Sequence, residues 1–372
     1  MKVLFACGGT GGHIYPALAL ADAIKTTAPG SDIPFLGTRS ILESSLISQA
    51  GYRHIPLVSQ KLTRKLTLSL LTFPFATLAA IIQAVMIVRW EKPEAVVVMG
   101  GFASFPAAIA AWFLRVPILL HDQNVIPGLA SRVIAPLSSI ITLGLPGGET
   151  RFPTGKAIVT GNPLRKPFLT TGRGTARQQL EIPESARVVA VLGGSLGARK
   201  INAMAEAFES LCQELPDLWI LHVTGQTQFG PGAPWGEASG IPGTEQRYKR
   251  IPYDHAPWNL LAAADLAVTR AGAMTISELQ ALHIPAILIP FPYAADNHQE
   301  ANARVLSETG AAVILSDLAL SGPELLRIMK SILNTSDTLS KMKASAAQFP
   351  QPDAAGALAT IVAGMIRSRK GR

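Results

Sequence analysis

Short apolar runs alternate with longer segments of helical periodicity over about the first 145 residues. Four of these runs are rich in leucine or β-branched residues and are bounded by turn-forming residues, as buried parallel strands are. They are residues 2–7, 95–99, 117–120 and 140–143. Segments with helical periodicity, such as 16–26 and 106–113, lie between them. The alternation predicts βαβ units and a parallel sheet.

The same alternation restarts in the second half, after a polar stretch that ends at Glu184. Its predicted strands are 188–192, 218–223, 266–268, 286–289 and 312–315. A paired-glycine turn follows the first strand of each half, at Gly8-Gly9 and at Gly193-Gly194. We therefore predict an α/β fold of two Rossmann-like, doubly wound parallel-sheet domains that face each other across a cleft.

The expected domain bounds are 1–163 and 164–353, and a helix at 354–369 is expected to pack back onto the first domain. The Gly- and Pro-rich stretch 225–243 is interpreted as a surface excursion of the second domain.

Composition favours a folded protein of a reducing compartment. Of 372 residues, 48% are hydrophobic and 16% are charged, which argues against disorder and leaves room for some exposed apolar surface. Cys7 and Cys212 could form at most one disulfide, and Cys7 lies in an apolar strand, so an intracellular location is expected. The apolar run before Gly8 is too short for a signal peptide.

The net charge of +8 does not come with a dense basic run interleaved with aromatic residues. Nucleic acid is therefore not an expected partner. Basic residues beside apolar segments instead fit an anionic membrane surface.

Each glycine turn has the chemistry of a phosphate site. Strand 2–7 runs into Gly8-Gly9-Thr10-Gly11-Gly12-His13 and then into a helix from about Pro16. Glycines let the backbone approach a ligand, and the amides at a helix N-terminus favour an anion, so a phosphate or diphosphate is expected. The second turn repeats the pattern, with a hydroxyl at Ser195 and a charge at Arg199. A tight turn without a ligand is the alternative for both.

Two more polar segments follow predicted strands of the second half. In 270–278, Glu278 is placed either to bind ribose hydroxyls or merely to complement the helix dipole. The run 296–299 lies where open α/β sheets bind ligands, but Asp296 or Asn297 could simply cap a helix there.

Seven motifs in this order resemble the MurG family of bacterial cell-wall N-acetylglucosaminyltransferases, which has the glycosyltransferase B fold. The motifs are 8–13, 99–102, 121–124, 161–165, 193–198, 270–278 and 296–299. The resemblance implies an inverting transfer of N-acetylglucosamine from UDP-N-acetylglucosamine. The acceptor would be the muramic acid 4-hydroxyl of undecaprenyl-pyrophosphoryl-muramoyl-pentapeptide, so that the product is the next lipid-linked peptidoglycan precursor.

The resemblance also implies which residues contact the donor, with Glu278 on the ribose and Gln299 near the sugar. The full set is Thr10, Gly11, Gly12, Asn124, Arg165, Ser195, Ala273, Met274, Thr275, Ser277, Glu278 and Gln299. In this interpretation the turn at Gly193 takes the donor diphosphate, and the turn at Gly8 takes the acceptor pyrophosphate and presents His13.

Inverting transfer needs one general base for the acceptor hydroxyl. His13 is the first candidate, because a helix start tends to lower the pKa of an imidazole. It could instead only hydrogen-bond the acceptor or orient the loop. Asp122, which stands where the family often has glutamate, is the second candidate and could serve as base or hold His13. No aspartate pair or Cys/His cluster has metal-ligand spacing, so we expect catalysis without a metal or cofactor.

The apolar stretch 66–88 is nearly long enough to span a bilayer, yet it contains Pro74 and Gln83 and lies between strands of the first predicted sheet. We expect a surface helix whose apolar face docks on the cytoplasmic leaflet of the plasma membrane, so that the protein is peripheral. The flanking basic residues are Lys61, Arg64, Lys65 and Arg89. A buried core helix is the alternative.

Rival functions remain open at the level of sequence. They are a two-domain glycosyltransferase for another acceptor, a UDP-sugar 2-epimerase, and a catalytically silent scaffold of the cell-wall machinery. Other cell-wall synthesis and division proteins are further candidate partners.

Overall fold

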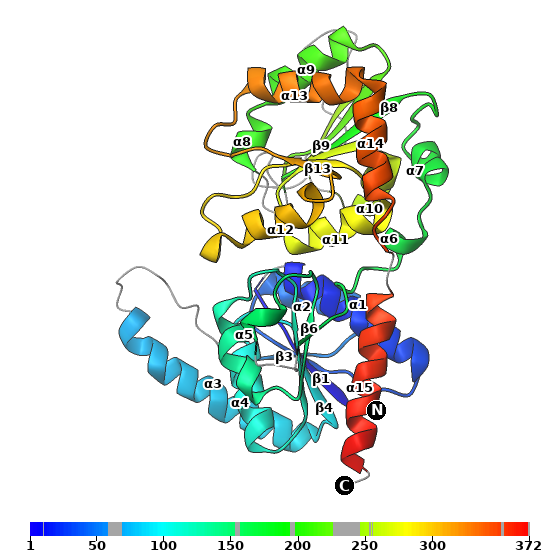
Figure 1. The fold of residues 1–372 in the computed structure, drawn as a ribbon. Coiled ribbons are helices and arrows are strands. Elements are labelled where there is room, and N and C mark those ends of the chain that lie inside the picture. The colour runs from blue at the N-terminus through cyan, green and yellow to red at the C-terminus, as the bar shows by residue number, and fades with distance from the viewer. Residues whose placement is uncertain are drawn as a thin grey trace. The chain divides into compact units, whose positions relative to one another are not determined.

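The computed structural model describes residues 1–9, 11–58, 69–152, 157–193, 198–225, 246–252, 254, 256–350 and 353–370. Contacts divide the chain into two compact units. The amino-terminal unit comprises Met1–Arg165 and Pro352–Arg372, and the carboxy-terminal unit comprises Lys166–Gln351. Each unit is a parallel sheet with helices on both faces (Figure 1).

The amino-terminal unit holds a parallel seven-stranded sheet in the order β3-β2-β1-β4-β5-β6-β7. Its strands are β1 (Val3–Ala6), β2 (Phe35–Gly37), β3 (His54–Pro56), β4 (Ala95–Val98), β5 (Ile118–Asp122), β6 (Ile140–Leu143) and β7 (Ala157–Val159). The chain builds outward in both directions from β1 and β4, so the order reverses between these two strands. Ligands of open α/β sheets bind at the carboxyl ends of the strands on either side of such a reversal.

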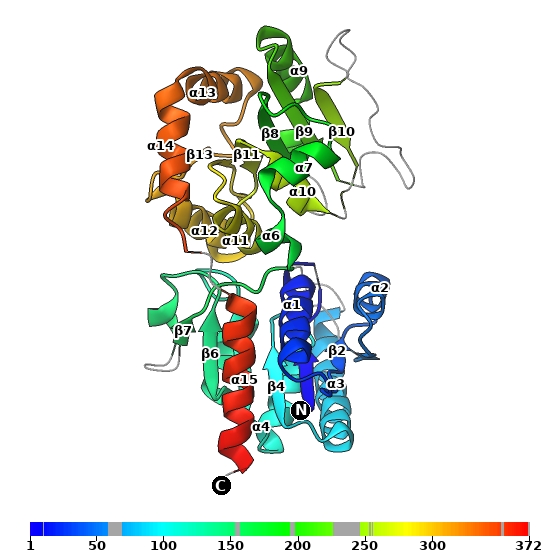
Figure 2. The same ribbon diagram turned by 90° about the vertical axis from the view of Figure 1, so that its right-hand side faces the viewer.

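Helices cover both faces of this sheet (Figure 2). One face carries α1 (Gly11–Thr27), α2 (Ile41–Gln49) and α15 (Ala354–Lys370). The other carries α3 (Ser69–Glu91), α4 (Ser104–Phe113) and α5 (Leu129–Ile134). Its described residues also include the short 3₁₀ turns η1 (Ala135–Leu137) and η2 (Glu149–Arg151).

The last helix, α15, belongs to this unit although the whole second unit precedes it in sequence. It packs beside α1, and its Leu358, Ala359 and Val362 lie in the same buried cluster as Val3 and Phe5 of β1. An amphipathic helix gains most of its stability from such a buried face.

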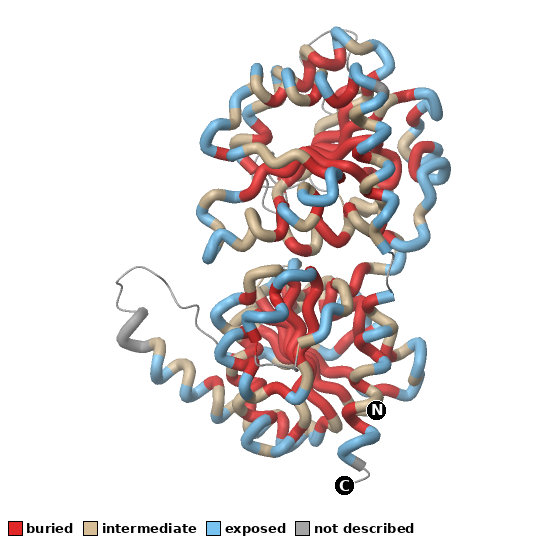
Figure 3. The backbone as a smooth tube through the Cα atoms, in the orientation of Figure 1, coloured by how far each residue is buried: buried red, intermediate tan, exposed pale blue. Residues whose placement is uncertain are grey.

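The carboxy-terminal unit holds a parallel six-stranded sheet in the order β10-β9-β8-β11-β12-β13. Its strands are β8 (Arg187–Leu192), β9 (Leu218–Val223), β10 (Tyr248–Ile251), β11 (Leu266–Thr269), β12 (Ala286–Leu288) and β13 (Ala312–Ile314). Its helices are α6 (Pro167–Thr170), α7 (Arg173–Gln179), α8 (Arg199–Asn202), α9 (Ala205–Glu214), α10 (Pro257–Ala263), α11 (Ala273–Leu282), η4 (Ala295–Asn297), α12 (His298–Ser307), α13 (Gly322–Asn334) and α14 (Ser336–Ala346). The buried strands of both units form their cores (Figure 3).

The fold class predicted from the sequence is confirmed, and all nine predicted strands are present within one or two residues of their expected bounds. The start of α1 differs, because the helix begins at Gly11 rather than near Pro16. Proline is tolerated in the first turns of a helix, where few N–H groups have intrahelical partners. His13 therefore lies inside the first turn of α1.

The long apolar helix α3 is a crossover between β3 and β4, which lie in the same sheet. Among the described residues, Phe73–Glu91 of this helix is long and apolar enough to cross a membrane by length and composition. Its Ala80, Ala84 and Val88 are buried, and it packs against α4. The basic residues Lys61, Arg64 and Lys65, expected to flank it, lie outside the described residues.

Candidate active site

The first glycine turn packs against the turn that follows β4. A Cβ on Gly101 would lie 2.0 Å from the carbonyl oxygen of Gly8, and Gly101 has a φ of +84°. Only glycine fits such a close approach without strain. The motifs 8–13 and 99–102, far apart in sequence, thus meet at the carboxyl ends of β1 and β4.

His13 is held by the glutamine that follows β5. Its Nδ1 lies 3.1 Å from Oε1 of Gln123, and Nε2 of Gln123 donates a hydrogen bond of 3.0 Å to the carbonyl oxygen of Met99. The ring lies against Gly100, where a Cβ would be 2.9 Å from Nδ1. Residues at the ends of two strands, β4 and β5, therefore hold one imidazole.

Burial lowers the pKa of His13, although the charge of Asp122 and hydrogen bonding of the ring to the oxygens of Gln123 and Met99 act in the opposite direction. The imidazole is consequently neutral near pH 7 and can accept a proton. Burial, rather than the helix dipole invoked from the sequence, is the largest cause of the shift.

Asp122 is buried and holds the loop after β5. Its Oδ1 accepts a hydrogen bond of 3.0 Å from the Asn124 amide, and its Oδ2 accepts one of 3.2 Å from the Gly128 amide. Both carboxylate oxygens thus shape the backbone around the partly exposed Asn124.

A buried histidine joins two of the sequence motifs. Nε2 of His121 lies 3.1 Å from Oδ1 of Asn162, whose Nδ2 donates to the carbonyl oxygen of Gln123 at 3.2 Å. The other ring nitrogen of His121 lies 3.0 Å from the Thr142 hydroxyl. Burial lowers the pKa of His121 to about 4, so this ring is a neutral structural link near pH 7.

A buried carboxylate on α2 occupies part of the glycine turn. Oε1 of Glu43 accepts hydrogen bonds from the Gly9 amide at 2.6 Å and the Thr38 hydroxyl at 2.7 Å, and Oε2 accepts one from the Thr38 amide at 2.6 Å. The Gly9 amide is therefore committed to the protein. The amides that open α1, at Gly11 and Gly12, are those that a helix leaves without intrahelical partners.

Arg165 stacks on the α1 side chain that follows His13 by two residues. Its guanidinium lies 4.3 Å from the centre of the Tyr15 ring, at the distance of a cation–π contact. Of the predicted donor contacts in this unit, Gly11, Gly12, Asn124 and Arg165 are described, and Thr10 lies outside the described residues.

The predicted donor contacts of the carboxy-terminal unit gather at the ends of adjacent strands β11 and β12. Residues 273–278 form the first turns of α11, where Ala273 and Ser277 are buried, and Met274, Thr275 and Glu278 are partly exposed. Gln299 is the second residue of α12, and its Oε1 accepts a hydrogen bond of 2.9 Å from the Phe291 amide. Ser195 lies outside the described residues.

Two features shape this region. Arg270 donates to the carbonyl oxygen of Ile289 at 3.0 Å and pairs with Asp317, which ties the ends of β11 and β12 together. Asp296 and Asn297 both adopt the left-handed conformation, and Asn297 occupies the N-cap position of α12 without a side-chain capping bond.

Sequence patterns signal the glycine turns but not the side chains that hold them. Gln123 and Glu43 act on residues 110 and 34 positions away. Glu43 has the local signature of an ordinary first-turn acid in a helix. The position of Gln123 inside the motif 121–124 is the only available hint of its contact with His13.

Among the described residues, no group of three or more His, Cys, Asp or Glu side chains could hold a metal ion. Cys7 and Cys212 are free and buried, and burial raises the pKa of the Cys212 thiol to about 12.

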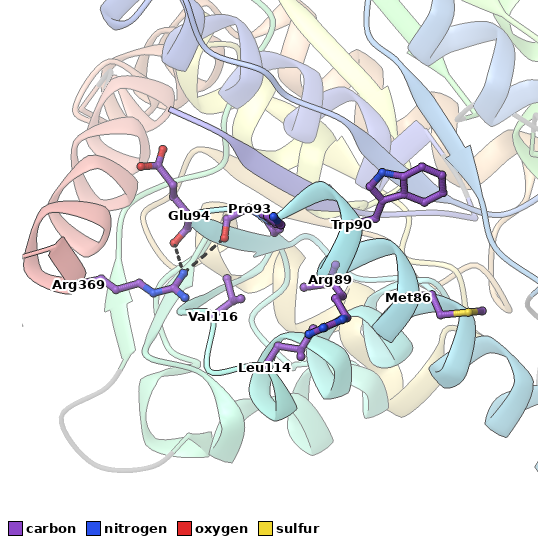
Figure 4. A pocket seen from close by; sticks show the side chains of 10 residues that line it. Met86, Arg89, Trp90, Pro93, Glu94, Leu114, Val116 and Arg369 are labelled. Carbon is purple, nitrogen blue, oxygen red and sulfur yellow. Dashed lines mark hydrogen bonds between the residues drawn. The ribbon is translucent and has the colours of Figure 1, made fainter.

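A pocket of about 780 Å³ lies at the amino ends of β4 and β5, opposite the carboxyl ends that lead to Gly100 and Gln123 (Figure 4). It is lined by Met86, Trp90 and Arg89 from α3 and by residues that precede β4 and β5, such as Glu94 and Val116. Arg369 of α15 donates there to the carbonyl oxygens of Pro93 and Glu94. This end of the sheet carries none of the predicted catalytic or donor-binding residues.

Both halves of the chain match known protein-family domains. Residues 3–139 match the glycosyltransferase family 28 N-terminal domain, and residues 188–358 match the glycosyltransferase family 28 C-terminal domain. The chain belongs to glycosyltransferase family 28. The first match covers β1 to β5 of the amino-terminal unit, and the second covers the sheet of the carboxy-terminal unit and the start of α15.

Family 28 relatives cover nearly the whole chain. A Halothermothrix orenii protein named UDP-N-acetylglucosamine--N-acetylmuramyl-(pentapeptide) pyrophosphoryl-undecaprenol N-acetylglucosamine transferase is 36% identical over 97% of this chain and 98% of its own length. A Salinibacter ruber protein of the same name is 36% identical over 97% of this chain and 95% of its own.

A solved structure of the same family agrees. The crystal structure of Acinetobacter baumannii MurG matches with a TM-score of 0.75 at 26% identity, covering 98% of this chain and 99% of that one. The resemblance to the MurG family and the glycosyltransferase B fold are thus confirmed. UDP-N-acetylglucosamine 2-epimerase from Neisseria meningitidis matches at 14% identity with a TM-score of 0.65, which shows a shared fold alone.

Proposed function

We propose that this chain transfers N-acetylglucosamine from UDP-N-acetylglucosamine to the muramic acid 4-hydroxyl of undecaprenyl-pyrophosphoryl-muramoyl-pentapeptide, with inversion at the sugar. The observation that carries the proposal is the full-length match to relatives named for this reaction. A neutral, firmly held imidazole at the carboxyl edge of the first sheet supports it.

His13 is the proposed general base. Inverting transfer needs a group that takes the proton of the attacking hydroxyl, and a neutral imidazole near pH 7 is suited to this. Asp122 is assigned the role of holding the loop after β5, because its two carboxylate oxygens accept hydrogen bonds from the Asn124 and Gly128 amides. Its charge also raises the pKa of His13, against the effect of burial.

The carboxy-terminal unit is the proposed donor site. Glu278 in the first turns of α11 would accept hydrogen bonds from ribose hydroxyls, and Gln299 would contact the sugar. Ser195 and the Gly193 turn would bind the donor diphosphate. Helix N-terminal amides stabilise the negative charge that develops on the leaving diphosphate, so the proposal requires no metal ion.

Radiolabelled UDP-N-acetylglucosamine with a short-chain lipid acceptor in detergent tests the function directly. Wild-type protein should form the labelled disaccharide lipid, and the absence of this product would refute the proposal. It would also separate the transferase from an epimerase, an enzyme for another acceptor or a silent scaffold.

The base is tested with His13→Ala, which should lower kcat roughly 10²- to 10⁴-fold while leaving the KM for the donor nearly unchanged. His283→Asn is the matched control, because His283 lies in the other unit and asparagine tolerates its left-handed φ of 54°. Asp122→Ala should lower kcat less than His13→Ala. Near-normal turnover of His13→Ala would reject the assignment.

A second part of the proposal places the protein on the cytoplasmic face of the bacterial plasma membrane as a peripheral protein. One face of α3 exposes large apolar side chains at helical spacing, and each is more than half exposed. They are Phe75, Leu78, Ile82, Met86 and Trp90. Trp112 and Phe113 are exposed at the end of the neighbouring helix α4. The smaller, alanine-rich face of α3 is the one that packs on the core.

Exposed apolar surface of this extent on a soluble domain indicates a binding surface. The basic side chain of Arg89 lies on the same helix and is exposed, as is typical of helices that lie on anionic lipid. A lipid-linked acceptor gives such docking a use, because it places the enzyme where the acceptor is.

Vesicle co-sedimentation tests the docking surface. Leu78 and Ile82 are each about half exposed, so replacing both with serine should weaken the free energy of membrane binding by roughly 1.5–3 kcal/mol. The partition coefficient between vesicles and water should then fall at least about tenfold. The control pair is Leu318→Ser with Ile158→Ser, which changes exposed apolar residues away from α3. Equal losses in the two pairs, or no wild-type binding to vesicles with or without anionic lipid, would reject the docking.

A further inference from the structure

We propose that Gln123 sets the tautomer of His13, so that Nδ1 carries the ring proton and Nε2 is the atom that receives the proton of the acceptor hydroxyl. The inference rests on the proposed role of His13 as general base, and it assigns a positioning role to the buried Gln123.

The polarity of the Gln123 amide is fixed by the backbone. A carbonyl oxygen can only accept, so the group that faces the Met99 oxygen at 3.0 Å must be the amide nitrogen of Gln123. The amide oxygen of Gln123 must then face His13, whose Nδ1 lies 3.1 Å away. Two acceptors cannot bond to each other, so Nδ1 must carry a hydrogen.

A neutral imidazole has one ring proton, so Nε2 of His13 is left with a free lone pair. This is the form that a general base needs. A ring with its proton on Nε2 would present a donor to the acceptor hydroxyl and could not take its proton.

The surrounding contacts leave the pair little freedom to rearrange. Gln123 is only 3% exposed, and its own carbonyl oxygen accepts a hydrogen bond from Asn162. The His13 ring lies on the Gly100 backbone, where a Cβ would come within 2.9 Å of it. Side chains locked by packing and hydrogen bonds are the usual means of holding a catalytic group in one geometry.

The neutral amide also suits the charges around the ring. Asp122 on β5 and Glu43 on α2 both raise the pKa of His13, while burial lowers it more, and the buried His121 lies near it as well. A carboxylate in place of Gln123 would add a third negative charge beside the ring and favour the imidazolium, which is not a base. An amide fixes the tautomer without that cost.

The first test is ¹⁵N NMR of the histidine rings in the full chain, with His13 assigned from the His13→Ala variant. Near pH 7 the wild-type spectrum should show a protonated Nδ1 and an unprotonated Nε2 for His13. Gln123→Met, which keeps the length of the side chain and removes both hydrogen bonds, should shift the ring toward the other tautomer. A wild-type ring protonated on Nε2 would overturn the proposal.

The second test is the pH profile of transfer. Gln123→Met should lower kcat roughly ten- to a hundredfold, with the KM for the donor within about twofold of wild type. Because the hydrogen bond that Nδ1 of His13 donates to Gln123 raises the pKa of His13, its loss should also move the acid limb of kcat/KM to lower pH. A variant that only loses folded protein would keep that limb in place.

Gln83→Met is the matched control. Gln83 also bridges two backbone groups, accepting from the Val58 amide and donating to the Pro56 carbonyl, but it lies on α3. The Gln83→Met variant should leave the His13 spectrum and the pH profile of transfer unchanged. Gln123→Met with wild-type kcat, tautomer and acid limb would overturn the proposal. Normal turnover of His13→Ala would instead reject His13 as base, and the spectra separate these two failures.

Discussion

Asp265, at the start of β11, is the point where four segments of the carboxy-terminal unit meet. Its buried carboxylate accepts hydrogen bonds from Nη2 of Arg177 at 2.9 Å, Nη1 of Arg173 at 2.7 Å, Nζ of Lys343 at 2.6 Å and the Val188 amide at 2.9 Å. These partners lie on α7, α14 and β8. Asp265→Ala should therefore loosen the two strands that lead into the proposed donor site.

The size of the effect follows from the burial of Arg177. Its side chain has 0% exposure, and without Asp265 the guanidinium keeps only backbone carbonyl partners such as those of Ala263 and Glu184. Removing one member of a buried ion pair costs about 3–5 kcal/mol of unfolding free energy. Arg173 and Lys343 are 44% and 39% exposed, so their pairs with Asp265 contribute about 0–1 kcal/mol each.

Thermal unfolding followed by tryptophan fluorescence, to which Trp219 and Trp258 of the carboxy-terminal unit contribute, measures this loss. The midpoint temperature of that unit should fall by roughly 6–20 °C, from about 2–4 °C for each kcal/mol. Arg173→Ala is the control and should cost less than about 1 kcal/mol. If Asp265→Ala costs no more than Arg173→Ala, the reasoning from the buried pair is wrong.

The same group gives the unfolding free energy a defined pH dependence. Burial alone would raise the pKa of Asp265, but the hydrogen bonds from Lys343 and the Val188 amide and the charge of Arg173 outweigh it and lower the pKa. Its contribution is therefore complete above the unfolded pKa of about 3.9 and is lost as the pH falls through the lower folded value. The difference in stability between wild type and Asp265→Ala should shrink when urea titrations at pH 7 are repeated near pH 3.

Three further outcomes are expected. Gly101→Ala should abolish most activity and lower the unfolding free energy by more than about 2 kcal/mol, because the new Cβ would overlap the Gly8 carbonyl at a positive φ. Gly30→Ala is the control, because Gly30 has open space around it. It should change neither the activity nor the unfolding free energy measured in urea. Glu278→Gln should raise the KM for UDP-N-acetylglucosamine roughly five- to thirtyfold and leave the KM for the acceptor unchanged in steady-state kinetics, and an equal effect on both substrates would count against a ribose contact. Transfer should persist in excess chelator, and a loss that divalent cations restore would show that a metal is needed.

The two sheets could be predicted because their strands are apolar on both faces. Parallel strands covered by helices appear in sequence as continuous runs of Val, Ile and Leu, as in β4 and β8. Four strands of the described residues were not predicted. Of these, β2 is buried but only three residues long, whereas β3, β7 and β10 are short and partly exposed. The latter three pair at sheet edges, where the neighbouring strand rather than an apolar run determines the structure.

The site was only partly predictable for a different reason. Glycine turns after strands have a local signature, so the turn after β1 and its residue His13 could be identified from the sequence, whereas residues 194–197 of the second turn lie outside the described residues. The side chains that hold His13 and the turn reach across the sheet from other strands and helices, as Gln123 and Glu43 do. Hydrogen bonds between residues far apart in the chain leave no local pattern in the amino-acid sequence.

Each unit has a buried strand histidine that is hydrogen-bonded to an asparagine in the same way. His121 on β5 bonds to Asn162, and His222 on β9 bonds to Asn202, with an Nε2 to Oδ1 distance of 3.1 Å in both. Each asparagine donates to a backbone oxygen two residues beyond its histidine, at Gln123 and Thr224.

Each of these histidines also meets a hydroxyl from the adjacent strand, at Thr142 on β6 and Tyr248 on β10. Burial lowers the pKa of His121 to about 4 and that of His222 to about 3, so both rings stay neutral across the physiological range. Their nitrogens are already bonded within the protein, which makes them structural links rather than acids or bases. His13 differs from both, because the Gln123 contact uses Nδ1 and leaves Nε2 for the chemistry proposed here.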